Sequence, residues 1–177
     1  MDVEDDHPTP NEAEELEPRM PALEDLLELC RELNAREARY VIVGGFAIRA
    51  AGYVRPTMDV DLLMATDLEN EAKVFKALEV FPDKAVQQLE PGEVEKYTVV
   101  RVADEIVVDL MKSACGIDYV EASKNVVMHE VQGVKIPFAS PQLLWRMKKP
   151  TMREKDAPDL LFLREYFRQR GEQPPEV

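Results

Sequence analysis

A short apolar run closed by two glycines constrains the fold of this chain more than any other segment. Tyr40–Val43 is rich in β-branched residues, and Gly44-Gly45 separate it from residues 46–51, which have a helical composition. This order predicts a strand, a tight turn and a helix. Glycine permits positive φ and close backbone approach, so the turn and the helix amino terminus could bind an anion such as phosphate. Taken alone, such a glycine pair is more often only a tight turn.

A second strand is predicted downstream, and it carries two acidic side chains. Apolar residues at positions 60, 62 and 64 alternate with Asp59, Asp61 and Leu63. Because alternate residues of a strand share a face, the two aspartates lie ~6 to 7 Å apart at the backbone. Paired carboxylates of this kind can hold one or two hard cations.

The remaining patterns predict an α/β domain with a single mixed sheet flanked by helices, including helices at the carboxyl end. The last helix is expected to begin after Asp156, because a start at Thr151 would place Pro158 in the helix interior at a cost of ~3 kcal/mol. The other expected elements are an amphipathic helix from Pro21 through Leu33, a helix from Thr66 or Asp67 to about Val80, a hairpin of Tyr97–Val102 and Glu105–Met111, a second hairpin of Val126–Val131 and Val134–Phe138 around Gln132-Gly133, and a helix from Ser140-Pro141 to about Lys149.

The amino-terminal segment differs in composition from the rest of the chain. Residues 1–18 hold eight of the 35 acidic residues and none of the 22 basic ones, so the rest carries a net charge of only −5. Acidic, proline-containing segments with few apolar side chains do not offset the entropy cost of ordering. We therefore expect a disordered acidic tail over residues 1–20 and a single domain over residues 21–177.

Composition also bounds the function and the cellular location. The total charge of −13 argues against a general nucleic-acid binder. No stretch approaches the ~18 apolar residues of a membrane span, and the acidic start does not resemble a secretory signal, so we expect a cytoplasmic protein without a membrane partner. Cys30 and Cys115 have no CxxC companion and are expected to be buried reduced thiols.

The glycine pair and the aspartate strand belong to a longer series of motifs. It reads GGFA at residues 44–47, RxTxDxDLL from Arg55 through Asp59 and Asp61, and RxKDxxDL from Arg153 to Leu160. This series closely resembles the signature of the DNA polymerase β-like nucleotidyltransferase superfamily. It is most similar to the small bacterial branch that includes uncharacterised and toxin-type nucleotidyltransferases. The resemblance covers about residues 38–165. This chain departs from the family pattern at Ala51, where relatives often have histidine, and at Pro158.

The resemblance implies a nucleotidyltransferase fold and a metal-dependent site. Catalytic and metal-binding roles fall on Asp59, Asp61 and a third carboxylate, for which Asp109 on the next apolar strand is the candidate. From its residues alone, Asp109 either faces a metal or pairs with a cation, and the pairing is the more common case. The implied cofactor is Mg²⁺, with two ions expected and Mn²⁺ as an alternative. Asp109 is also the expected acceptor of the substrate proton.

The nucleotide site implied by the resemblance comprises Gly44, Gly45, Arg55, Thr57, Lys155 and Asp156. For Arg55, a salt bridge is as good an explanation as a contact with the triphosphate. For Thr57, a hydroxyl that only supports the strand is as good an explanation as a hydrogen bond to phosphate. Asp156 is expected to orient Lys155 or to contact the substrate. A positive wall for phosphates is further suggested by five cations within ten residues, namely Arg146, Lys148, Lys149, Arg153 and Lys155.

These observations predict transfer of a nucleoside monophosphate from an NTP to an acceptor hydroxyl, with release of pyrophosphate. The family's acceptors are tRNA ends, proteins and small molecules, and the sequence does not choose between them or between the nucleotide bases. The alternative is a catalytically silent module with a cognate protein partner, such as one component of a toxin–antitoxin pair. A third possibility is an acidic adaptor that acts through residues 1–20.

Overall fold

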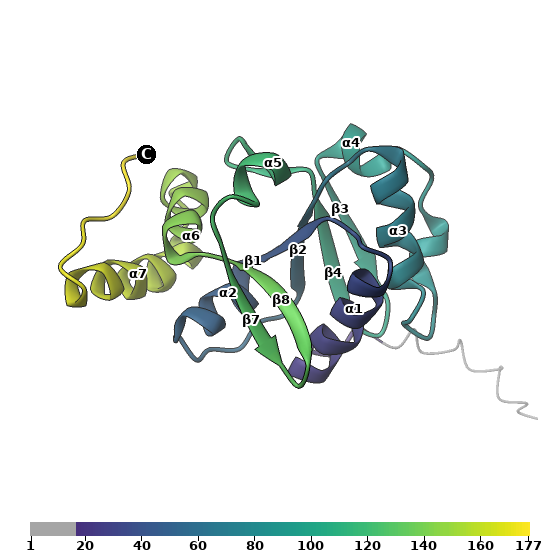
Figure 1. Ribbon diagram of the computed structural model, residues 1–177, viewed down its shortest axis with the longest axis horizontal. Coiled ribbons are helices and arrows are strands. Elements are labelled where there is room, and N and C mark those ends of the chain that lie inside the picture. Colours follow the sequence, from purple (N-terminus) through teal and green to yellow (C-terminus); the bar gives the residue numbers. More distant parts are fainter. Residues whose placement is uncertain (1–16) are drawn as a thin grey trace, which may run out of the picture.

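The computed structural model describes residues 17–177 and contains a six-stranded mixed sheet with helices on both faces (Figure 1). The strand order is β3-β4-β2-β1-β8-β7. The sheet strands are β1 (Tyr40–Val43), β2 (Val60–Met64), β3 (Val99–Ala103), β4 (Val107–Met111), β7 (Val126–Val131) and β8 (Val134–Ala139). The helices are α1 (Leu23–Ala35), α2 (Gly44–Ala51), α3 (Leu68–Leu78), α4 (Glu93–Tyr97), α5 (Tyr119–Ala122), α6 (Pro141–Lys148) and α7 (Ala157–Gln169).

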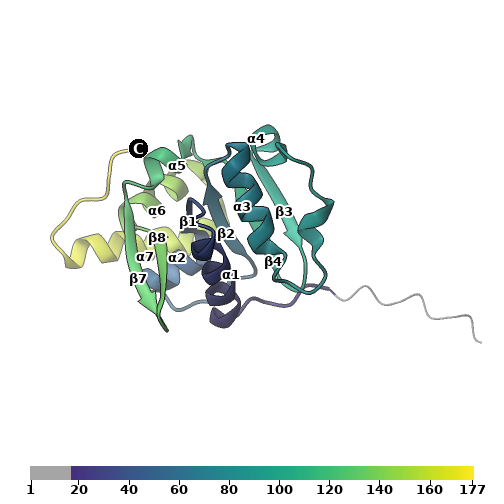
Figure 2. The ribbon, with the colours of Figure 1, turned by 45° about the vertical axis from the view of Figure 1, so that its right-hand side comes forward.

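Two groups of helices enclose the sheet. Figure 2 shows α1 and α3 on the near face, and α2, α6 and α7 behind it. Strand β2 is therefore buried on both faces beyond its first residues, and Leu62, Leu63 and Met64 are almost completely covered. Parallel pairing joins β2 to β4 and β1 to β8, whereas the other neighbours in the sheet are antiparallel. The predicted mixed α/β architecture is confirmed.

Local signals placed several elements correctly. The Asp67 carboxylate accepts a hydrogen bond from the Asn70 amide at the start of α3, and the Ser140 hydroxyl accepts one from the Leu143 amide at the start of α6. In the β7–β8 hairpin, Gln132 and Gly133 have φ of 49° and 77°, as a two-residue turn with both residues left-handed requires.

The glycine pair does not form a separate turn. Helix α2 begins at Gly44 itself, directly after β1, because the positive φ of Gly44 (65°) turns the chain within a single residue. The prediction of a distinct tight turn was wrong.

At the start of α7, the predicted boundary was right but the capping role was not. Asp156 precedes the helix, and Pro158 lies harmlessly in the first turn. The Asp156 carboxylate does not cap the helix, because it accepts hydrogen bonds from Thr151 and Arg153 instead.

The two cysteines have different environments. Cys30 is fully buried, as expected, but Cys115 is exposed, which corrects the prediction for that residue. Cys115 lies with φ of 50° in the turn between the short strands β5 (Ser113–Ala114) and β6 (Ile117–Asp118). This small hairpin was not predicted, and it holds the residue outside the core.

The expected tail falls mostly on residues 1–16, outside the described residues. Within the described part, the Arg19 amide donates to the carbonyl of Glu105 (2.9 Å), and the Arg19 guanidinium pairs with Asp25. None of the helices in residues 17–177 is both long enough and apolar enough to cross a membrane.

Candidate active site

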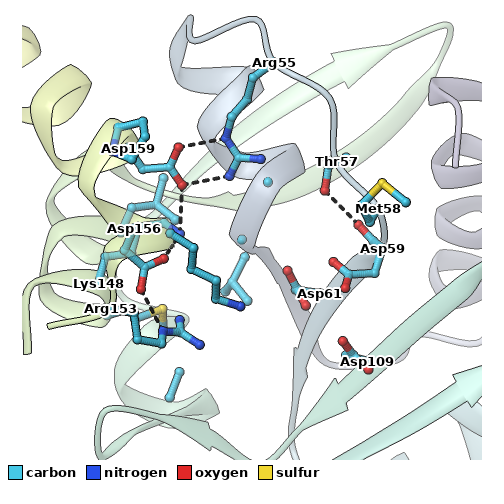
Figure 3. Close-up of a pocket in the computed structure, with 18 of the residues that line it drawn as sticks. Arg55, Thr57, Met58, Asp59, Asp61, Asp109, Lys148, Arg153, Asp156 and Asp159 are labelled. Carbon is cyan, nitrogen blue, oxygen red and sulfur yellow. Dashed lines mark hydrogen bonds and ion pairs between the residues drawn. The ribbon is translucent and has the colours of Figure 1, made fainter. Parts of the chain in front are cut away.

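Three aspartates converge at the start of β2 and the middle of β4. Asp61 on β2 lies opposite Asp109 on β4 in the parallel register, and Asp59 directly precedes β2. One carboxylate oxygen from each of the three lies within 4.8 Å of the others. Figure 3 shows the three side chains together on one side of a cavity. The strand pairing thus brings together the three acids that the sequence analysis selected.

The electrostatics of this cluster favour a bound cation. Loss of water around the Asp61 carboxyl, together with the negative charges of Asp59 and Asp109, raises its pKa to about 7. The same causes, desolvation first, raise the pKa of Asp59, although Arg101 opposes the shift. Among residues 17–177, no side chain forms a hydrogen bond or ion pair with the Asp61 carboxylate. Oxygen ligands with unbalanced negative charge are the donor set that Mg²⁺ and Mn²⁺ prefer, so these residues fit a divalent cation.

Gly44 allows the Asp61 side chain to lie against the start of α2. A Cβ atom built on Gly44 would lie 1.9 Å from Oδ2 of Asp61, and the positive φ of Gly44 is itself unfavourable for other residues. Gly45 has the same relation to Thr57, since its Cβ would lie 2.3 Å from the Thr57 hydroxyl oxygen. The two glycines therefore let the start of α2 pack directly against the acidic strand.

Thr57 is buried and acts within the chain. Its hydroxyl donates to the carbonyl oxygen of Asp59 at 3.1 Å. This bond holds the backbone just ahead of β2, which supports the structural alternative for Thr57.

A network of ion pairs lies across the cavity from the acidic cluster (Figure 3). The Arg55 guanidinium makes two hydrogen bonds of 2.7 Å to Asp159, so the salt-bridge alternative for Arg55 describes its state in this structure. Lys148 bridges Asp159 at 3.0 Å and Asp156 at 3.4 Å, and Arg153 contacts Asp156 at 2.8 Å. The network links the loop before β2 to the ends of α6 and α7.

Asp156 is buried within this network. Burial alone would raise its pKa, but the Thr151 hydroxyl and the charges of Lys148 and Arg153 lower the pKa on balance. The carboxylate thus orients Lys148 and Arg153, whereas the sequence analysis expected it to orient Lys155 or to contact the substrate.

The cavity itself has a volume of about 500 Å³, which lies within the usual range for ligand sites. Of the five clustered cations, Lys148, Arg153 and Lys155 line it. Arg146 pairs instead with Glu121, and Lys149 lies over the Trp145 ring at 5.9 Å. Lys155 is exposed, and none of the ion pairs within residues 17–177 includes it.

Comparison with known proteins places this arrangement in a known fold. No protein-family model and no curated protein matches the chain, but solved structures do. One is a lincosamide antibiotic adenylyltransferase with lincomycin bound, which is 15% identical with a TM-score of 0.56 over 84% of this chain and 99% of its own. Another is an antigenic nucleotidyltransferase-like protein from Paracoccidioides brasiliensis, 17% identical with a TM-score of 0.50 over 86% of this chain and 78% of its own. This chain has the nucleotidyltransferase fold.

In this nucleotidyltransferase fold, one residue of the candidate site, Arg101, was not predicted from the sequence. Arg101 on β3 lies directly opposite Asp109 in the antiparallel register. Its Nε and Nη2 atoms each lie 3.0 Å from an Asp109 oxygen, and Nη2 also lies 3.4 Å from Asp59. The alternation of exposed and buried residues in β3 placed Arg101 on a definite face, but only the hairpin register pairs it with Asp109.

Asp109 pairs with a cation, which is one of its two sequence-based alternatives, and the metal-ligand alternative stays a prediction. It also lies close to the other two carboxylates of the candidate site. With its side chain only 9% exposed, Asp109 depends on Arg101 to offset the cost of burying its charge.

Proposed function

We propose that this protein transfers a nucleoside monophosphate from an NTP to an acceptor hydroxyl and releases pyrophosphate. One observation supports this proposal above all. Asp59, Asp61 and Asp109 meet beside Gly44 in a cavity whose opposite wall is cationic, within a nucleotidyltransferase fold. A silent binding module would not need three mutually repelling carboxylates in one place.

Asp59, Asp61 and Asp109 are proposed to hold divalent cations, namely two Mg²⁺ ions or Mn²⁺ in their place. Such ions neutralise charge on the triphosphate and lower the pKa of an acceptor hydroxyl. The Asp61 carboxylate forms no hydrogen bond or ion pair with a side chain within residues 17–177, so its oxygens are open to such an ion.

The opposite wall is proposed to bind the nucleotide. Lys155 has no carboxylate partner among the described residues, so its ammonium group is available to a phosphate oxygen. The amides of Gly44 and Gly45 open α2, and a helix amino terminus favours an anion. Arg55 can add charge from the same side, but its pairing with Asp159 restricts its reach.

Thr57 and Asp156 complete the proposed nucleotide site as positioning residues. Thr57 fixes the backbone at Asp59, and Asp156 holds Lys148 and Arg153 at the cavity wall. Both side chains are buried, so they act through their neighbours rather than by touching the nucleotide.

In the proposed reaction, the acceptor oxygen forms a bond to the α-phosphorus while the bond from that phosphorus to the bridging oxygen breaks. Pyrophosphate leaves with the electron pair, and Lys155 and Arg55 stabilise its charge. The acceptor proton passes to Asp109. Acceptors consistent with the proposal are a tRNA end, a protein hydroxyl and a small molecule such as those used by antibiotic adenylyltransferases.

Thermal unfolding tests this function without knowledge of the acceptor. The wild type and the Asp59→Asn/Asp61→Asn variant are heated with Mg²⁺ alone and with Mg²⁺ plus each of ATP, GTP, CTP and UTP. A ligand at 100 times its dissociation constant stabilises the folded state by about 2.7 kcal/mol, so a shift confined to the wild type would support the site and identify the base. Absence of a shift with every nucleotide would contradict the proposal.

A second assay follows transfer directly. Asp61→Asn should abolish transfer of label from an α-labelled NTP to an acceptor and its release as labelled nucleoside monophosphate by hydrolysis, while the variant still unfolds cooperatively. Full activity of this variant would remove Asp61 from the mechanism.

A further inference from the structure

The Arg101 side chain places a positive charge directly at the acidic cluster of Asp59, Asp61 and Asp109. It extends from edge strand β3, directly across the hairpin from Asp109. The planar guanidinium covers both Asp109 oxygens, with Nε and Nη2 each 3.0 Å from one of them. This two-point arrangement is the strong geometry for an arginine and a carboxylate.

The same guanidinium also reaches the second acid of the cluster. Its Nη2 atom lies 3.0 Å from Oδ2 of Asp109 and 3.4 Å from Oδ2 of Asp59. One positively charged nitrogen thus lies between two carboxylates that a shared cation would also have to contact. A residue that only oriented Asp109 would be expected to contact those Asp109 oxygens that point away from the other two acids.

The Asp61 side of the cluster is open by comparison. Arg101 forms no hydrogen bond or ion pair with Asp61 in the described chain, and Gly44 borders that carboxylate with backbone alone. The three acids therefore present two unequal places for a cation, one free between Asp59 and Asp61 and one held by Arg101 between Asp59 and Asp109.

Arg101 is able to leave its place. Its side chain is 62% exposed, and among residues 17–177 no strand pairs with the outer side of β3. Because the guanidinium is already largely in water, its displacement costs little in solvation once another cation neutralises the buried Asp109.

We propose that Arg101 occupies the cation position between Asp59 and Asp109, and that a divalent ion must displace it to bind there. This inference rests on the proposed function, because it concerns the same metal-binding acids. It makes Arg101 a residue that sets how many ions the protein holds before a nucleotide arrives. Asp59 and Asp61 would hold the first ion, and the second would compete with the guanidinium for Asp59 and Asp109.

Counting bound Mn²⁺ tests this inference without measuring activity. Electron paramagnetic resonance of free Mn²⁺ gives the number and affinity of bound ions for the nucleotide-free wild type and for Arg101→Gln. The variant should bind the second ion about tenfold more tightly or better, which is opposite in sign to the loss of about 10- to 100-fold that usually follows removal of a residue supporting a metal ligand. An unchanged or weaker affinity in Arg101→Gln would overturn the inference.

Arg153→Gln is the matched control for loss of charge. It removes one guanidinium from the same cavity, but Arg153 pairs with Asp156 and touches none of the three acids. Its Mn²⁺ affinity should stay close to that of the wild type. An equal gain in Arg153→Gln would mean that net charge, and not displacement, explains the effect.

Arg101→Lys covers the case in which Arg101→Gln does not fold. Lysine keeps the charge but lacks the planar fork, so this variant should bind Mn²⁺ more tightly than the wild type and less tightly than Arg101→Gln. If only the lysine variant folds, an affinity no higher than that of the wild type overturns the inference.

Failure of the proposed metal site and failure of the inference about Arg101 would give different results. If neither the wild type nor Arg101→Gln binds Mn²⁺, the metal site of the proposed function is wrong and this inference falls with it. If the wild type binds Mn²⁺ and loses it in Asp59→Asn/Asp61→Asn, the metal site holds. A wild-type affinity for both ions in Arg101→Gln would then reject the role of Arg101 alone.

Discussion

Asp61 and Asp109 lie directly opposite each other on the neighbouring parallel strands β2 and β4. The pairs on either side of them, Val60 with Val108 and Leu62 with Leu110, are almost completely buried. Two like charges therefore project from the rim of an apolar core, where water solvates them poorly. Such an arrangement lowers the stability of the folded state unless a cation or a proton neutralises part of this negative charge.

The contribution of Asp61 to the stability of the metal-free protein should fall as the pH rises from about 4 to 7. The folded state keeps a proton on Asp61 up to a pKa of about 7, whereas the unfolded chain loses it near the ordinary value of 3.8. Between these values the folded state binds more protons, so its stability decreases with increasing pH. Thermal unfolding in EDTA across this range measures the slope, and Asp61→Asn should reduce it.

A divalent cation should reverse this dependence. Mn²⁺ or Mg²⁺ competes with the proton for Asp61, so the stabilisation by either ion should be greater at pH 8 than at pH 6. An equal shift at both values would show that Asp61 is already ionised without metal.

Gly44→Ala should disrupt the acidic cluster. The new Cβ would overlap Oδ2 of Asp61, and the positive φ of residue 44 adds backbone strain of about 1 to 3 kcal/mol. The matched control is Gly133→Ala, because Gly133 also has positive φ (77°) but no atom of the described residues lies within 4 Å of a Cβ built there. Both variants should unfold at lower temperature, and only Gly44→Ala should lose Mn²⁺ binding. Retained binding would show that Asp61 moves aside freely.

Lys155→Ala should weaken nucleotide binding while leaving the fold unchanged. Lys155 is exposed and has no carboxylate partner within residues 17–177, so its removal disturbs no ion pair there. A hydrogen bond to a charged group contributes about 1.5 to 3 kcal/mol, which corresponds to an increase of about tenfold or more in the dissociation constant of Mg²⁺–NTP. Calorimetry of binding measures it. Lys149→Ala provides the control, since Lys149 lies over Trp145 and does not line the cavity.

Asp159→Asn should destabilise the protein strongly. The Asp159 side chain is 2% exposed and balances both Arg55 and Lys148, so its neutralisation leaves two cations without their shared partner. Removing one member of a buried ion pair costs about 3 to 5 kcal/mol. Denaturant unfolding compares this variant with Glu165→Gln, which breaks the exposed pair to Arg168 and should cost about 1 kcal/mol or less. Similar losses in the two variants would show that the buried network contributes no more than a surface pair.

The sequence by itself determined those features that depend on neighbouring residues. The alternation around Asp61, the Ser140 cap and the Gln132-Gly133 turn each act over a few residues, and the structure has β2, α6 and the β7–β8 hairpin where they predict them. The selection of Asp109 needed the family resemblance as well, because an apolar strand with one acid has more than one explanation.

Tertiary structure alone decided which distant groups meet. Arg55 and Asp159 are 104 positions apart, and their pairing depends on how α7 packs against the loop before β2. Arg101 faces Asp109 because the β3–β4 hairpin adopts one register, and a shift of one residue would turn Arg101 to the other face of the sheet. Residue patterns report local conformation, whereas charge partners depend on the packing of the whole chain.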